Sequence, residues 1–129
     1  MKEDFLMTLN KAEAIHTLAV HMGISDGHFS KDEISRLEHN PKFEGMRKIA
    51  NYNIFDTKIN PKKSTIDSAV QTLKSLDLNG QIEALSIIWH ILIADGLMQP
   101  GESVLMNNLL TEFNIKIETI SNNLQEMLS

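Results

Sequence analysis

Hydrophobic side chains recur along most of this chain at the three- and four-residue intervals of an α-helix, and no segment keeps the alternation of a β-strand. Ile15, Leu18, Ala19 and Met22 form one such stripe, and Ala84–Ala94 is apolar almost throughout. Further stripes include Phe43 with Met46, Ile66 with Val70, Leu105 with Leu109, and Ile117 with Ile120. The pattern predicts an all-α fold, a single-domain bundle of about seven helices that covers residues 1–129.

Residues with capping chemistry set the limits of the first two helices. The first helix is predicted to end near Ser25. Ser30 and Glu33 then form a capping box, in which the hydroxyl and the carboxylate each bond a backbone N–H group that a helix start leaves without a partner. A second helix is therefore expected to begin after Ser30 and to extend to about His39.

Asparagine followed by proline marks two further helix starts, at Asn40-Pro41 and Asn60-Pro61, because asparagine caps well and proline fits the first helical position. The Asn79-Gly80 pair is interpreted as a break in the chain. The one long loop expected within the domain runs from Asn53 to Lys63. The remaining helices are predicted over residues 81–94, 100–113 and 116–128.

The same polar signature occurs twice, and the shift along the chain that superposes the two copies also superposes hydrophobic positions around them. It consists of a histidine, an Asp-Gly pair five residues later, and a glutamate six residues after the glycine. The two copies are His21, Asp26-Gly27 and Glu33, and His90, Asp95-Gly96 and Glu102. The bundle is therefore predicted to contain two duplicated helical hairpins, at roughly residues 10–40 and 79–113.

Composition excludes several classes of function. With no cysteine, the 129-residue chain forms neither disulfides nor thiolate metal sites, which fits a reducing, cytoplasmic setting. A net charge of -5 repels nucleic acid. The N-terminus lacks the apolar core of a signal peptide, and Ala84–Ala94 is too short to cross a bilayer, so no insertion into a membrane is expected.

The two loops share part of the pattern of an EF-hand calcium loop, in which a glutamate follows the glycine by six residues. Gly27 and Glu33 keep this interval, but Met22 and Ile24 occupy the positions of the first two carboxylates, so an EF-hand is excluded. Carboxylates remain that could hold a divalent cation, and the histidines would favour zinc, manganese or iron over calcium. The candidate metal ligands are Asp26, Glu33, Asp95, Glu102, His21 and His90.

The same residues also fit a structural role without metal. Glycine commonly ends a helix, aspartate accepts hydrogen bonds from loop amides, and glutamate completes a capping box. His90 lies among apolar residues, where a neutral histidine that is hydrogen-bonded in the core is common. The pattern thus leaves both roles open.

No residue pattern identifies a catalytic site. The chain has no phosphate-binding glycine loop and no recognisable order of nucleophile and base. A metal-dependent hydrolase would have to use the same histidines and carboxylates around a metal-activated water. We therefore expect no enzymatic activity and no catalytic residues.

The segments Ile24–Glu33 and Ile93–Glu102 resemble the two Ala-Asp-Gly…Glu loops of the TerB-like family, which includes tellurite-resistance proteins and the N-terminal domain of a membrane-anchored co-chaperone. With the surrounding helices, the resemblance covers most of the chain, and it departs from the family at Ser25 and at Pro100-Gly101. It implies a bacterial helical bundle that acts in stress or tellurite-linked systems. It also implies suspected metal ligands at Asp26, Glu33, Asp95 and Glu102.

The alternative function is a protein-interaction domain that binds no metal. Such a domain would act as a co-chaperone-type regulator or associate with itself, through an exposed apolar patch. Phe29 and Met98 occupy equivalent loop positions in the two copies and are candidates for that patch. The expected partner is another protein or a second copy of this chain.

Overall fold

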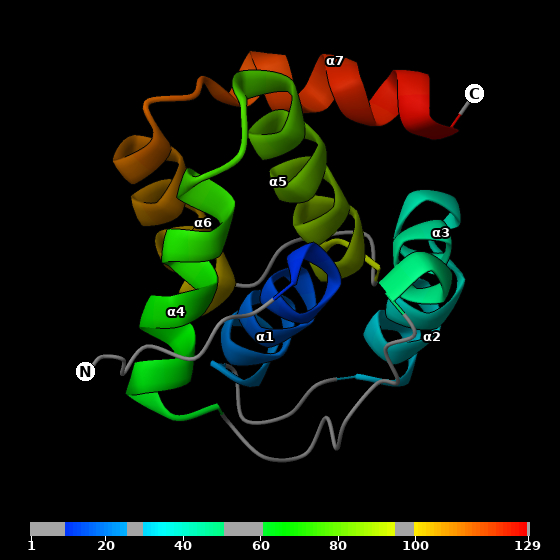
Figure 1. The fold of residues 1–129 in the computed structure, drawn as a ribbon, viewed down its shortest axis with the longest axis horizontal. Helices are drawn as coiled ribbons and strands as arrows, with labels where there is room; N and C mark the ends of the chain where they lie inside the picture. Colours follow the sequence, from blue (N-terminus) through cyan, green and yellow to red (C-terminus); the bar gives the residue numbers. More distant parts are fainter. Residues whose placement is uncertain (1–9, 26–29, 51–60, 95–99, 129) are drawn as a thin grey trace.

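Seven α-helices make up nearly all of the part of the chain that the computed structural model describes, residues 10–25, 30–50, 61–94 and 100–128 (Figure 1). Within these ranges there is no strand, and no helix has the length and apolar character needed to cross a membrane. The prediction of an all-α, seven-helix bundle is confirmed. The helices are α1 (Lys11–Ile24), α2 (Lys31–His39), α3 (Pro41–Ala50), α4 (Lys63–Lys74), α5 (Leu78–Leu92), α6 (Pro100–Phe113) and α7 (Ile117–Leu128).

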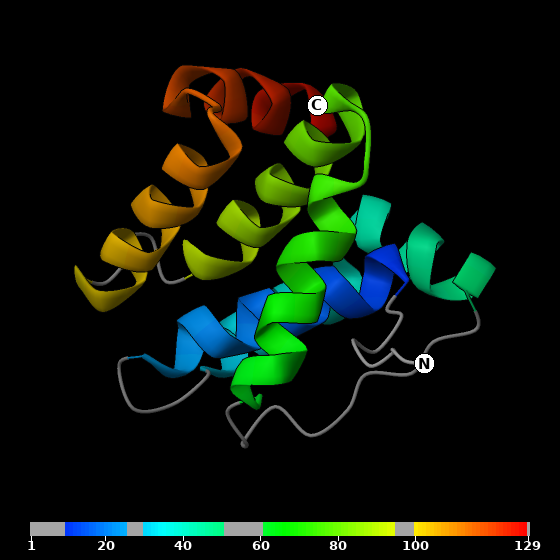
Figure 2. The ribbon, with the colours of Figure 1, turned by 60° about the vertical axis from the view of Figure 1, so that its left-hand side comes forward.

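Two helices, α1 and α5, form the centre of the bundle. They pack against each other; α1 also contacts α3, α4 and α6, and α5 also contacts α2, α4, α6 and α7. Ten of the fourteen residues of α1 are buried, so apolar side chains surround the helix on nearly every face. A helix that is apolar all round belongs in a core. The other helices, more polar on their outer faces, cover this central pair (Figures 1 and 2).

Burial repeats at the interval that separates the two copies of the sequence signature. Leu18 and its counterpart Ile87 are both fully buried or nearly so, and the same holds for Met22 and Ile91. In order and in the burial of these positions, α1 and α2 thus correspond to α5 and α6. The packing differs between the two pairs, because α5 packs against α6 whereas α2 packs chiefly against α3 and α5.

Most of the predicted helix limits in the first half are confirmed. Helix α1 ends with Ser25 as its C-cap, and α2 begins after Ser30 with the expected capping box. Asn40 caps α3, because its Oδ1 accepts hydrogen bonds from the backbone N–H groups of Lys42 and Phe43, each at 3.0 Å. These three limits depend on local chemistry alone, which explains why sequence reasoning found them.

Two predicted helix limits are wrong. Helix α4 begins two residues later than Pro61, and its N-cap residue, Lys62, makes no side-chain capping bond. The expected break at Asn79-Gly80 lies inside the first turn of α5, because Asp77 caps that helix by accepting a hydrogen bond from the Gly80 N–H at 2.8 Å. A Cβ on Gly80 would lie 3.0 Å from Asp77 Oδ1, so the glycine serves close packing against the cap. Of the loop predicted from Asn53 to Lys63, residues 53–60 lie outside the described residues.

A tight turn after α6 directs α7 across α5. Asn114 adopts a left-handed conformation with φ 56°. The Ile115 N–H donates to the Leu110 carbonyl at 3.0 Å, and the Asn114 N–H donates to the Thr111 carbonyl at 3.1 Å. This pair of bonds is the Schellman arrangement, which asparagine adopts more readily than most residues. Helix α7 then lies over α5, with Ile120 fully buried (Figure 1).

Candidate functional site

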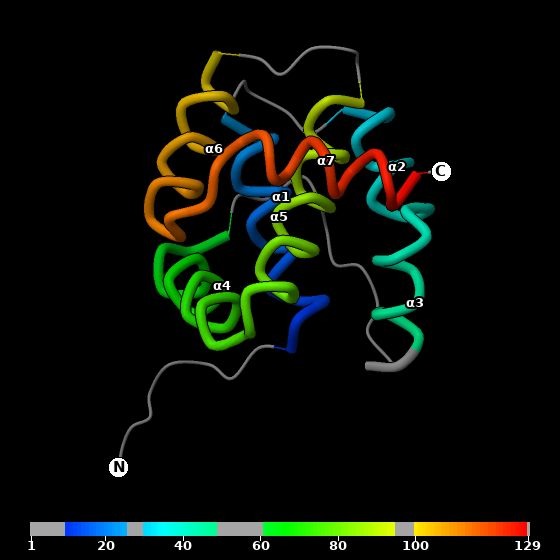
Figure 3. Tube along the Cα trace, turned by 90° about the horizontal axis from the view of Figure 1, so that it is seen from above, coloured from blue at the N-terminus to red at the C-terminus, as the bar shows by residue number. Residues whose placement is uncertain are grey.

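The described helix ends that flank the two Asp-Gly loops lie on the same side of the molecule. The C-terminal ends of α1 and α5 and the N-terminal ends of α2 and α6 gather at the left of Figure 2 and in the upper part of Figure 3. His21 and His90 belong to the last turns of α1 and α5, and Glu33 and Glu102 to the first turns of α2 and α6. The fold therefore brings four of the six candidate ligands to one side. Outside the described residues lie Asp26, Asp95, His28, Phe29 and Met98.

Glu33 is buried, with only 3% of its surface exposed. Its Oε1 accepts a hydrogen bond from the Ser30 N–H at 2.8 Å, and its own N–H donates to Ser30 Oγ at 3.0 Å. The second carboxylate oxygen, Oε2, is buried as well, and no described residue donates a hydrogen bond to it. A buried carboxylate oxygen that no donor or cation meets is costly, so this atom is open to a further partner.

Glu102, the counterpart of Glu33 in the second copy, is 2% exposed. It lies in the first turn of α6, which begins at Pro100. Glutamate is among the residues least often buried, and here two of them are buried at equivalent positions. The two copies of the signature therefore share a buried acidic position as well as a short sequence pattern.

His90 of α5 contacts Asn40 through its ring and Arg36 through its backbone carbonyl. Its Nδ1 lies 2.8 Å from Asn40 Nδ2, and its backbone carbonyl accepts a hydrogen bond from Arg36 Nη1 at 2.9 Å. The Asn40 side chain is fixed in orientation, because its Oδ1 already accepts from the N–H groups that begin α3. Its Nδ2 must then donate to His90 Nδ1, which places the proton of the neutral imidazole on Nε2.

This contact favours the structural role of His90 over metal ligation. Burial lowers the pKa of His90, and the positive charge of Arg36 lowers it further, so the neutral ring is preferred. A metal at Nε2 would require the proton to move to Nδ1, where Asn40 donates. The shift that superposes His21 on His90 also superposes Asn40 on Leu109, and a leucine cannot make the equivalent contact to His21. The two histidines therefore differ in their surroundings despite their matching positions.

Three other histidines complete the set outside the candidate ligands. His16 is fully buried in α1, where burial and the nearby charge of Arg47 lower its pKa to about 3. His39 is exposed, and its Nδ1 lies 2.9 Å from the Ser35 carbonyl oxygen. His28 lies outside the described residues.

Among the described residues, no three histidine or acidic side chains come close enough to hold a metal ion together. The surface cavities include ones of about 240, 580 and 400 Å³, and among the described residues that line these three there is no candidate ligand. Comparison of the chain with protein families, with curated proteins and with solved structures finds no match.

Proposed function

We propose that the chain is a non-enzymatic, TerB-like binding module that holds a divalent cation in its Asp-Gly…Glu loops and serves a stress or tellurite-resistance system. The observation that supports a bound cation is the burial of Glu33, whose Oε2 receives no hydrogen bond from the described residues. Its counterpart Glu102 is equally buried, and both begin helices on the same side of the molecule. Asp26 and Asp95 supply the second carboxylate of each loop in this proposal.

The cation assignment rests on Glu33 Oε2 and not on the helix dipole, because the partial positive charge at a helix N-terminus attracts a carboxylate and repels a cation. A cation beside the carboxylate would compensate the cost of burying it, and carboxylate oxygens suit hard cations such as calcium or manganese. Since His90 Nδ1 is engaged by Asn40, the carboxylates are the principal ligands in this proposal.

The first test is the metal content of the purified protein, followed by its melting temperature with added calcium, manganese and zinc. A cation that binds only the folded state at about 100 times its Kd adds roughly 2.7 kcal/mol of stability, or on the order of 10 °C for a chain of this size. The shift should vanish in Glu33→Gln combined with Glu102→Gln, and in Asp26→Asn combined with Asp95→Asn.

Glu38→Gln is the matched control, because Glu38 is exposed on the same helix as Glu33. It should keep the full metal-induced shift. If the wild type contains no metal and melts at the same temperature with every cation, the cation sites are disproved. A metal-free protein-interaction domain would then become the better proposal, supported by exposed apolar side chains such as Leu78 and Val104, which are 61% and 59% exposed.

A further inference from the structure

We propose that Asn79-Gly80, at the start of α5, is a site of spontaneous deamidation that the N-cap of the helix keeps slow. It is the only Asn-Gly pair in the sequence. In this reaction the backbone nitrogen of the second residue attacks the side-chain carboxamide carbon of the asparagine. Glycine hinders the attack least, because it has no Cβ beside the nucleophilic nitrogen. Neither residue belongs to an Asp-Gly loop, so the inference stands independently of the cation sites.

The reaction consumes water and needs no other reagent. The Gly80 nitrogen bonds to Cγ of Asn79, which closes a succinimide ring. The carboxamide nitrogen leaves as ammonia and takes up the proton that the Gly80 N–H has lost. Water then opens the ring at either of its two carbonyl carbons. One opening gives aspartate, and the other gives isoaspartate, in which the main chain runs through the former side-chain carbon. Either product carries one negative charge that asparagine lacks.

Two hydrogen bonds to Asp77 oppose the first step. Asp77 Oδ1 accepts from the Gly80 N–H at 2.8 Å, so the nucleophilic nitrogen keeps its proton and lies beside a negative charge. The Asp77 carbonyl accepts from the Gln81 N–H at 2.9 Å, which closes the first helical turn around Asn79. Ring closure requires the backbone of Asn79 to leave its helical conformation. The first turn of α5 must therefore open before the ring can form.

Opening of this turn is a local event. The first N–H groups of a helix have no acceptor within the helix, so the Gly80 N–H depends on the Asp77 cap. Asn79 is exposed, and water reaches its carboxamide directly. Helix ends open at a much lower free-energy cost than the whole bundle unfolds. The rate of deamidation should therefore follow the opening of this one turn and not the global stability of the protein.

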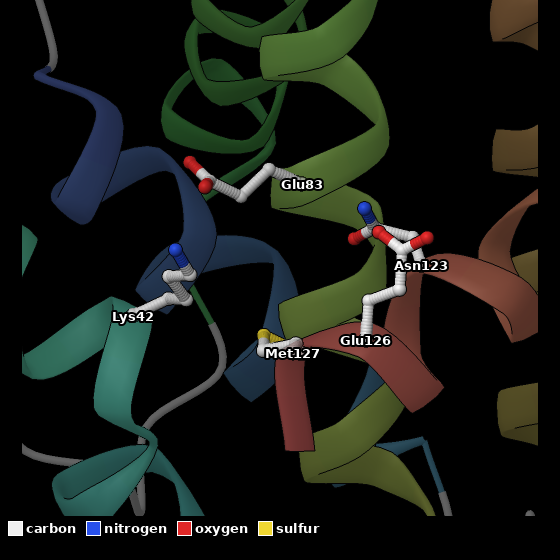
Figure 4. Close-up of a pocket in the computed structure, with 5 residues that line it drawn as sticks. All are labelled: Lys42, Glu83, Asn123, Glu126 and Met127. Atoms are coloured by element: carbon white, nitrogen blue, oxygen red, sulfur yellow. The ribbon is translucent and has the colours of Figure 1, made fainter. Parts of the chain in front are cut away.

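The product changes the surface between α5 and α7. Asn79 lines a cavity of about 400 Å³ together with Glu83 and Glu126. Both glutamates also line the neighbouring cavity in Figure 4, where Glu83 extends from α5 and Glu126 from α7. A carboxylate at position 79 lies four residues before Glu83, and like charges at that spacing destabilise a helix. Isoaspartate also lengthens the main chain between Asp77 and Gly80, so both hydrogen bonds of the first turn are lost.

The experiment is incubation of the full chain at mildly alkaline pH with a chelator, followed by digestion and mass spectrometry of the peptide that contains Asn79. A blocked peptide with the sequence of residues 75–84 is the unfolded reference, and the wild type should deamidate many times more slowly. Asp77→Ala removes the cap and should speed the reaction about fivefold. Hydrogen exchange at the Gly80 amide should rise by the same factor. Asp77→Ser keeps a capping side chain and should stay near the wild-type rate.

Asn40→Ala separates local opening from global unfolding. It removes the contact to His90 at the far end of α5 and should destabilise the whole protein more than Asp77→Ala does, yet leave the deamidation rate unchanged. The proposal is overturned if the wild type deamidates as fast as the free peptide, or if Asp77→Ala is no faster than the wild type. It is also overturned if Asp77→Ser or Asn40→Ala accelerates the reaction as much as Asp77→Ala. The chelator keeps the cation sites empty, so either proposal can fail while the other stands.

Discussion

Asn40 connects more of the structure than any other polar side chain described above. It is 1% exposed, caps α3 through Oδ1 and donates to His90 through Nδ2. Its backbone N–H also donates to the Arg36 carbonyl at 2.8 Å, which closes the end of α2. Asn40 thus links α2, α3 and α5 by hydrogen bonds from one backbone group and one short side chain.

Replacing Asn40 by alanine should lower the free energy of unfolding by about 2 kcal/mol, because a helix cap is lost and a partly buried imidazole nitrogen loses its donor. Urea unfolding measures the change. Asn108→Ala, at an exposed position of α6, is the matched control and should cost less than about 0.5 kcal/mol.

A second variant tests the direction of the Asn40–His90 hydrogen bond. Asn40→Asp keeps the cap but replaces the donor by a carboxylate, which favours protonated His90, so the pKa of His90 should rise relative to the wild type. An NMR titration of the His90 ring reports this. An unchanged pKa of His90 would contradict the assigned hydrogen bond.

His16 makes the stability of the protein dependent on pH. Its pKa in the folded state is about 3, below the value of 6.5 expected for the unfolded chain, so the unfolded state binds more protons between these values. Stability is therefore fully present above about pH 6.5 and falls as the pH drops toward 3. The expected contribution of His16 is up to about 1.4 kcal/mol per pH unit.

Urea unfolding of the wild type and of His16→Gln between pH 7 and pH 4.5 tests this effect. The variant should show a shallower loss of stability with falling pH, whatever its stability at pH 7. Equal slopes for the two proteins would refute the role of His16. His90, whose pKa is also lowered, adds to the slope in both proteins in the same direction.

At the scale of elements, the start of α5 shows how a cap and a glycine work together. Asp77 accepts from the Gly80 N–H, and the space beside Gly80 is too small for a Cβ without adjustment. The sequence Asn79-Gly80 suggested a turn because this pair is common in turns, but a better cap two residues earlier extends the helix. The competition between two local signals explains the error.

Asp77→Ala should therefore destabilise the protein by about 1 kcal/mol, which corresponds to a drop in melting temperature of roughly 4 °C. Asn79→Ala is the informative control, because Asn79 lies within the helix and alanine is a good helix former. It should be neutral or slightly stabilising. The opposite order, with Asn79→Ala the more harmful, would favour a chain break at Asn79-Gly80.

At the scale of the whole molecule, the duplication places equivalent features on one side. Helices α1 and α5 pack together in the centre, and the helix ends beside both loops emerge in the same direction (Figures 2 and 3). This arrangement brings Glu33 and Glu102 to the same face, a relationship that the separation of the two copies along the sequence left undetermined.

The sequence by itself determined the features that depend on neighbours within a few residues. Helical periodicity predicted seven helices, and the caps at Ser30 and Asn40 marked where α2 and α3 begin. Each of these features depends on hydrogen bonds or side-chain spacing along one short segment. They could be read without knowing how the helices pack.

Only the tertiary structure decided which distant residues meet. Asn40 and His90 are 50 residues apart, so the contact that fixes the proton on His90 leaves no local pattern. The burial of Glu33 and Glu102 depends on how the helices pack, and the packing is decided by the area buried over the whole bundle. Packing depends on contacts between segments that are far apart in the sequence. Local patterns within one segment do not show which distant segment it will contact.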